Sequence, residues 1–430
     1  MMKHDIEADP APSPPFVSRV QVRGFRSLAE CDVRLGPLTV LAGANASGKS
    51  NFVDALRFVR DAVARSPGQA LADRGGLDSV LTRARSAGPE PAQAAATFVI
   101  ALELSLGSAD GTAVYEVEIG RDPAGERSHL VLRETCVLQL PEEEVSFTAD
   151  LGADGRRVVR GGIPGARLGV EELLLPIVGR LAPYDILLRS LLRPRFYELD
   201  SEILRSLDET AAGHSQLGEH GEHLGQVLGH LARDHPAFKE SLDEYLRALI
   251  PLSLGVDQRL QGDYATIQAR FWTGEPALPY WTAVAEGKVR AGDPYVEVFQ
   301  RKQLSEGTVR AAGVLAALHQ PDVLTGLIPL VAIEEPETAI HPSKVGVLLA
   351  VLKDASARTQ VIVTTQSSDL LDPEEAHPSM LRIVEMTDGA TRVGELSEYT
   401  QRHLIEHPSQ LPEMHRQGHL RPVDPAGQGA

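Results

Sequence analysis

Residues 43–51 read GANASGKSN, which contains the spacing G-x-x-x-x-G-K-S from Gly43 to Ser50. Glycines at the two ends let the backbone adopt conformations that are closed to residues with a side chain. In a loop wound this way, successive N–H groups point inward and hold phosphate oxygens. Lys49 supplies a positive charge for the outer phosphates, and the Ser50 hydroxyl is suited to ligate magnesium. The stretch predicts a phosphate-binding loop that consists of Gly43, Ala44, Asn45, Ala46, Ser47, Gly48, Lys49, Ser50 and Asn51.

The flanking sequence places this loop between a strand and a helix. LGPLTVLAG, which ends at Gly43, has the apolar residues of a strand. The dipole and the free N–H groups at a helix start add to anion binding. The alternative is a Gly/Ser/Asn loop that fits the pattern by chance, and such a loop would not need to lie between a strand and a helix. The helix after Ser50 is predicted from apolar residues at helical spacing, namely Phe52, Val53, Leu56, Val59 and Val63.

Length and composition limit the class of protein. The chain has 430 residues, more than one compact core usually holds, so we expect two lobes or one lobe with a large insertion. A net charge of -17 argues against a wholly basic nucleic-acid binder but leaves room for a local basic groove. The 2 cysteines, Cys31 and Cys136, fit a reducing cytosol. Since no secretory signal or membrane span is visible, we expect a cytoplasmic protein without a membrane partner.

Patterns along the chain predict an α/β fold in several segments. Period-two patterns between residues 95 and 162 indicate an antiparallel meander. LGQVLGHLARDHPAFKESLDEYLRALIP is typical of a helix pair broken near Pro236, and strands and helices alternate again from residue 304. We therefore expect a flexible tail (1–15), an N-terminal lobe with the loop and the β meander (16–164), a mainly helical insertion (165–298), a C-terminal lobe (299–400) and a disordered tail (401–430).

Two adjacent carboxylates, Glu334 and Glu335, end the apolar run LIPLVAIEE. Paired charges at the C-terminal edge of a buried strand are costly unless a cation or phosphate chemistry uses them. Beside a phosphate-binding loop, Glu334 is the candidate magnesium ligand, directly or through water. Glu335 is the candidate that polarises the attacking water. A solvated strand end before the turn at Pro336 is the alternative.

LSEGTVR, residues 304–310, is a second candidate anion site. The Ser305 side chain and the Gly307 backbone lie where a helix is predicted to begin, and helix starts bind anions. An ordinary helix N-cap with Glu306 nearby is the alternative. Two such helix starts in one chain suggest a shared site. One would hold the phosphates from below, and the other would close over the γ-phosphate from a second subunit.

With these motifs in this order, the chain resembles the RecF/SMC-like branch of ABC-type ATPases, often labelled AAA, and the ATPase half of OLD-family nucleases. The resemblance covers roughly residues 16–395. It implies an ABC/SMC-like P-loop NTPase head that binds ATP and Mg2+. Two heads would form a homodimer with ATP sandwiched between the LSEG stretch of one and the loop of the other. The motifs that carry it are VQVRGFRSL, GANASGKSNFVDALRF, FYELDSE, LSEGTVR, AIEEPETAIHP and TQVIVTTQSSDLLD.

Gln366 departs from the pattern of this family. The last strand of these ATPases usually ends TTHS, with the His against the γ-phosphate, whereas here it ends TTQS. A Gln amide still donates a hydrogen bond to phosphate, but it carries no charge and does not titrate. The resemblance therefore places Gln366 in the catalytic site and implies slower turnover. The alternative is that the change from His to Gln at position 366 is neutral and that Glu335 is sufficient for hydrolysis.

The leading hypothesis is an ATPase that closes head to head on ATP and acts on DNA or a partner protein, in DNA repair or phage defence. The second is an ATP-controlled binding module that regulates a separate effector, which Gln366 favours slightly. A nuclease arm is the third. The stretch after the last strand lacks the acidic cluster of a nuclease domain, so that activity would need another chain. A transporter ATPase fits the motifs least.

Overall fold

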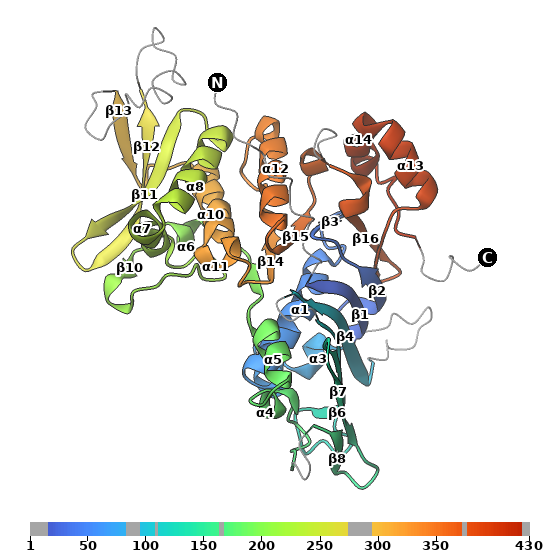
Figure 1. Ribbon diagram of the computed structural model, residues 1–430. Coiled ribbons are helices and arrows are strands. Elements are labelled where there is room, and N and C mark those ends of the chain that lie inside the picture. Colours follow the sequence, from blue (N-terminus) through green and yellow to red (C-terminus); the bar gives the residue numbers. More distant parts are fainter. Residues whose placement is uncertain are drawn as a thin grey trace.

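Three sheets and the helices around them form the part of the chain that the computed structural model describes (Figure 1). The described residues are 16–82, 95–107, 111–162, 167–273, 295–371 and 376–423. The tail expected at residues 1–15 lies outside them. Within these ranges, no helix has the length and apolar character needed to cross a membrane.

A six-stranded sheet carries the predicted phosphate-binding loop. Its order is β17-β16-β3-β15-β14-β9, and all neighbours run parallel except β17, which is antiparallel to β16. Because parallel strands end at the same edge, the loops that follow β3, β15, β14 and β9 lie together. The α/β prediction is confirmed. The strands are β3 (Leu38–Ala42), β9 (Arg195–Tyr197), β14 (Leu330–Glu334), β15 (Gln360–Thr365), β16 (Leu381–Thr387) and β17 (Ala390–Gly394).

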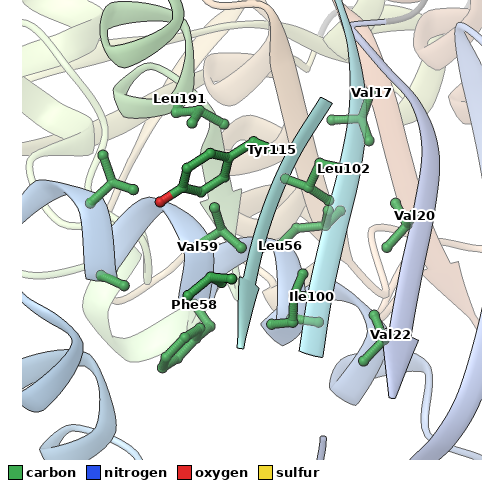
Figure 2. Packing of buried hydrophobic residues seen from close by; sticks show 14 of the residues in the cluster. Val17, Val20, Val22, Leu56, Phe58, Val59, Ile100, Leu102, Tyr115 and Leu191 are labelled. Atoms are coloured by element: carbon green, nitrogen blue, oxygen red, sulfur yellow. The ribbon is translucent and has the colours of Figure 1, made fainter. Parts of the chain in front are cut away.

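A seven-stranded antiparallel sheet, in the order β2-β1-β4-β5-β6-β7-β8, includes the predicted meander. Helix α1 (Lys49–Ala64) packs its apolar face against this sheet, where Leu56 and Val59 lie near Ile100 and Leu102 (Figure 2). Burying one such side chain stabilises the fold by about 1.5–3 kcal/mol, so this packing holds the helix start in place. The strands are β1 (Val17–Phe25), β2 (Leu28–Arg34), β4 (Thr97–Leu106), β5 (Gly111–Gly120), β6 (Leu130–Gln139), β7 (Glu144–Leu151) and β8 (Arg157–Gly161); short helices α2 (Pro67–Ala72) and α3 (Leu77–Val80) follow α1.

The segment 165–298 contains helices and also a sheet that the helical pattern did not predict. Helices α7 (Leu224–Asp234) and α8 (Pro236–Leu249) break at the proline, as expected. Strand β12 (Tyr264–Trp272) then pairs with β11 (Ser253–Gln261), and Gly262, with a φ of 60°, makes the turn between them. Glycine suits this left-handed position. The remaining elements are α4 (Leu175–Val178), α5 (Tyr184–Leu192), α6 (Ser201–Leu204), β10 (Asp208–Glu209), η2 (Thr210–Ala212) and β13 (Val296–Gln300).

Much of the described chain after residue 400 is helical, whereas the sequence predicts disorder for 401–430. Helices α13 (Glu398–Glu406) and α14 (Leu411–Arg416) lie beside β16 (Figure 1). Buried Leu404, Leu411 and Leu420 join the core of the six-stranded sheet, and this burial explains the order. Residues 424–430 lie outside the described part. The other elements of this half are α10 (Glu306–His319), α11 (Pro321–Leu324), η3 (Pro342–Lys344), α12 (Val345–Ser356), η4 (Ser368–Leu371), η5 (Pro378–Met380) and η6 (Pro408–Gln410).

Candidate functional site

The loop between β3 and α1 is wound so tightly that its two glycines have no room for a side chain. A Cβ on Gly43 would lie 2.2 Å from the carbonyl oxygen of Val384. Gly48 has a φ of 102°, and a Cβ there would lie 2.0 Å from Thr391 Oγ1. Gly48 is also the N-cap of α1, and the N–H groups of the next two residues have no acceptor among the described residues. These N–H groups are therefore free to bind an anion.

A chain of hydrogen bonds fixes the loop between the two larger sheets. Asn51 Nδ2 donates to Ser27 Oγ at 2.6 Å, and the Ser27 and Thr391 hydroxyls are 2.6 Å apart. Thr391 Oγ1 then donates to the carbonyl oxygen of Ser47 at 2.8 Å. Ser27 lies in the turn between β1 and β2, and Thr391 lies in β17. Asn51, Ser27 and Thr391 thus form one hydrogen-bonded chain, which ties the loop to the β1–β2 turn and to β17.

Lys49 reaches back over the loop that precedes it. Its side chain is buried, and Nζ donates to the carbonyl oxygens of Gly43 and Ala44 at 2.9 Å each. Burial lowers the pKa of Lys49, and the negative charges of Glu335, Glu337 and Glu334 oppose that shift. All three carboxylates come from β14 or the turn after it. The structure therefore brings the loop lysine together with the two acids predicted from the sequence.

Ser50 and Glu334 make a direct contact across the site. Ser50 Oγ donates to Glu334 Oε2 at 2.5 Å, although the two residues lie far apart in sequence. Burial raises the pKa of Glu334, and the Ser50 hydrogen bond and the charge of Arg57 oppose this shift. A hydroxyl and a carboxylate at the carboxyl edge of a sheet are the oxygen ligands that Mg2+ prefers. This pair fits that ion.

Glu335 is held in an uncommon backbone conformation beside β15. Its φ is 45°, and its N–H donates to the carbonyl oxygen of Thr364 at 3.1 Å. Positive φ is rare for residues other than glycine, and the surrounding structure has to hold it. Gln366 Nε2 donates to Glu335 Oε2 at 3.1 Å. Both predicted catalytic side chains thus lie at the same edge as the loop and contact each other.

Ser305 and Gly307 lie at the start of α10, the second candidate anion site. Ser305 is the N-cap of α10 and its hydroxyl accepts the N–H of Thr308 at 3.2 Å. A Cβ on Gly307 would lie 2.3 Å from the carbonyl oxygen of Ala339, so the helix start packs closely on the chain after β14. Ser305 is exposed, and neither residue hydrogen-bonds to residues 43–50 in the described part of the chain. Within the described part of one chain, the two helix starts are therefore not joined by a hydrogen bond, although Arg310 of α10 donates to the carbonyl oxygen of Glu335.

Arg57 and Glu198 adjoin Glu334, and neither was predicted from the sequence as a site residue. Arg57 Nη2 lies 3.8 Å from Glu334 Oε1, and the Nε and Nη2 atoms of Arg57 have no hydrogen-bond partner among the described residues. Arg57 lies seven positions after Ser50 in α1, so both residues are on the same face of the helix. Glu198 follows β9 beside β14, and its charge helps to raise the pKa of Glu334. Helical spacing could have revealed Arg57, whereas Glu198 needs the strand order.

The sequence profile of one family matches residues 38–372, more than half of the chain. The family is described as "AAA domain, putative AbiEii toxin, Type IV TA system". A comparison with curated proteins finds no match.

Solved structures with a similar fold are heads of SMC proteins. The SMC head bound to the C-winged helix domain of ScpA has 15% sequence identity and a TM-score of 0.51, and the match covers 90% of this chain and 100% of that one. The SMC head from Thermotoga maritima has 15% identity and a TM-score of 0.41, covering 89% and 99%. The Smc head with an extended coiled coil from Pyrococcus furiosus has 15% identity and a TM-score of 0.43, covering 92% and 100%. The first of these, at its low identity, shows the fold alone, and it confirms the predicted SMC-like head.

Proposed function

Because the chain belongs to the family described as "AAA domain, putative AbiEii toxin, Type IV TA system" and has the fold of an SMC head, we propose that it binds ATP with Mg2+ and hydrolyses the bound ATP. The observation that carries the proposal is the hydrogen bond between Ser50 and Glu334, beside a lysine that faces Glu335. The loop and the paired acids are separate local patterns in the sequence. An incidental loop would have no reason to fold against those acids.

Each residue of the site has a role in this proposal. The N–H groups of residues 43–50 hold the phosphates, and Lys49 turns from its two carbonyl partners to neutralise them. Ser50 and Glu334 hold Mg2+, which neutralises charge that develops on the phosphates. Glu335 accepts a hydrogen bond from the attacking water, and Gln366 keeps its carboxylate in place. Arg57 offsets the repulsion among the carboxylates around Glu334.

We also propose that two copies close on ATP, with residues 16–164 and 299–400 as the two lobes of each head and 165–298 inserted between them. The exposed position of Ser305 supports this arrangement, because a helix start apart from its own loop is available to a second copy. Ser305 and the N–H of Gly307 would then face the γ-phosphate bound by the partner. Closure of this kind would act on DNA or on a partner protein.

Substitution of the loop lysine tests nucleotide binding. Lys49→Ala should weaken ATP binding at least about tenfold, since it removes a charge-assisted contact to phosphate. Equilibrium binding of ATP with Mg2+ measures this loss, and Lys302→Ala, on an exposed side chain, is the matched control. If Lys49→Ala binds ATP as tightly as the unaltered chain, the phosphate-binding role of the loop is wrong.

Substitution of the second acid separates binding from hydrolysis. Glu335→Gln should bind ATP normally, release phosphate at least about a hundredfold more slowly and accumulate an ATP-bound dimer. Phosphate release and size-exclusion chromatography with ATP measure the two effects. Glu142→Gln, in an exposed turn, should behave like the unaltered chain. Rapid phosphate release by Glu335→Gln would contradict the catalytic role.

A slow regulatory module is the second candidate function, and Gln366 is the observation that favours it. Its amide is engaged with Glu335 and brings no charge to the phosphate. Phosphate release measured with and without DNA distinguishes the two candidates: a DNA-coupled ATPase is stimulated, whereas a regulatory module stays slow in both. The family description names a putative toxin of a Type IV TA system, and we propose phage defence as one setting for such a module.

A further inference from the structure

A cavity of about 470 Å³ adjoins the phosphate-binding loop. The loop lines it with Ala44 and Asn45, and the chain after β15 lines it with Gln366 and Ser368. The third wall comes from the C-terminal helix α14 and includes His415. A helix in the stretch that the sequence predicts to be disordered thus forms one wall of a cavity next to the phosphate-binding loop.

His415 is held in a fixed position in this wall. Its Nδ1 lies 2.9 Å from Ser368 Oγ, so the ring is tied to the segment that directly follows Gln366. Helix α14 packs against η4, which begins at Ser368. Buried Leu411 and Leu420, on either side of His415, anchor this part of the chain in the core. The imidazole is therefore positioned by both local and distant contacts.

The charge at the centre of the site acts on this ring. Burial lowers the pKa of His415, and the positive charge of Lys49 lowers it further. A neutral imidazole carries one N–H. When Nδ1 accepts the hydrogen bond from the Ser368 hydroxyl, Nε2 carries the hydrogen and is a donor for an anion. The described residues offer His415 no other hydrogen-bond partner. The charged groups nearby are paired elsewhere, Arg416 with Glu413 and Glu385 with Arg421.

The contacts of Gln366 indicate which phosphate this donor would meet. Gln366 lines the cavity and also donates to Glu335 Oε2. Gln366 therefore links the cavity to Glu335, and residues 383–386 of β16 form a further wall. Under the function proposed above, Glu335 activates water next to the γ-phosphate. A donor in the cavity beside Gln366 would accordingly meet the terminal phosphate.

We propose that His415 donates a hydrogen bond to the terminal phosphate of bound ATP, so that the C-terminal helix α14 is part of the nucleotide site and distinguishes ATP from ADP. This inference rests on the proposed ATP site. It assigns to the last described helix of the chain a direct part in sensing the nucleotide.

Equilibrium binding of a non-hydrolysable ATP analogue and of ADP to the full chain tests the proposal. His415→Ala should weaken binding of the analogue about tenfold, which corresponds to about 1.4 kcal/mol, and should leave ADP binding unchanged. His415→Gln keeps an N–H donor and should lose less. His419→Ala, on an exposed residue of the same segment, should change neither affinity.

Two results would overturn the inference. An equal loss of analogue and ADP affinity in His415→Ala would mean that His415 only holds α14 in place. Unchanged affinity for both nucleotides would mean that it makes no contact with them. Failure of the proposed function has a different signature, because the unaltered chain would then bind the analogue no more tightly than Lys49→Ala does.

Discussion

Gly48 shows how one residue decides whether the site can form. Its φ of 102° is a conformation that side chains rarely adopt, and Thr391 and Ser27 occupy the space that a Cβ would need. The same position begins α1 and exposes the N–H groups that would bind phosphate. The G-x-x-x-x-G-K-S spacing predicts this use of glycine from the sequence. The close contact of Thr391, in β17, with Gly48 could not have been predicted from the sequence.

At the residue scale we predict that Gly48→Ala lowers ATP affinity at least about tenfold, because backbone strain and the contact with Thr391 Oγ1 both displace the loop. Gly76→Ala is a matched control, since Gly76 has a φ of 88° but a Cβ there meets nothing within 4 Å. The control should lose only about 1 kcal/mol of stability and keep its ATP affinity. Equal affinities for the two variants in a binding titration would refute this view of Gly48.

At the scale of an element, helix α10 has a start that could be predicted from the sequence and a burial that could not. It begins at exposed Ser305, is buried along most of its length and ends at buried His319. Its N-cap could be predicted from LSEGTVR, because capping chemistry is local. Its burial could not, since the helices around it come from the segment 165–298, where the sequence pattern showed α7 and α8 but not the sheet of β10–β13. Period-two patterns in short strands are weaker than the patterns of long helices.

At the element scale we predict that the end of α10 makes the fold sensitive to acid. Burial lowers the pKa of His319, so the folded state binds this proton less readily than the unfolded state does. Its contribution to stability is therefore present above the ordinary histidine pKa and is lost as the pH falls below it. The melting temperature should drop between about pH 7.5 and about pH 5.5, and less so in His319→Gln. His407→Gln, on an exposed residue, should melt like the unaltered chain at both pH values; an equal drop in all three would rule out this role.

At the scale of the whole molecule, the proposed dimer would build each nucleotide site from two chains. The loop, the paired acids and Gln366 meet at one edge of the six-stranded sheet, whereas Ser305 is exposed and makes no hydrogen bond to the loop in the described part of the chain. A second copy would bring its α10 to the open side of the nucleotide. The order of the strands creates the first half of this site, and association of two chains would create the second.

We predict that two inactive variants restore each other when mixed. Lys49→Ala lacks a working loop, and Ser305→Glu places a negative charge against the phosphates bound by its partner. Random pairing gives mixed dimers with one intact site, so an equimolar mixture should recover about a quarter of the phosphate-release rate. Lys49→Ala mixed with Glu335→Gln alters the same side of the site and should recover nothing. A silent first mixture would place Ser305 outside the partner's nucleotide site.

The sequence by itself determined the parts of this protein that depend on neighbours along the chain: the wound loop at Gly43–Ser50, the helix after it, the acids that end β14, and the α/β class. Turn conformation, helix capping and strand burial are local properties, so their patterns can be seen in short stretches. Only the tertiary structure decided that β15 lies between β3 and β14, and that Glu198 and His415 adjoin the site. Strand order and the packing of α14 depend on burial between segments far apart in sequence. The spacing of residues along the chain does not predict which of these segments pack together.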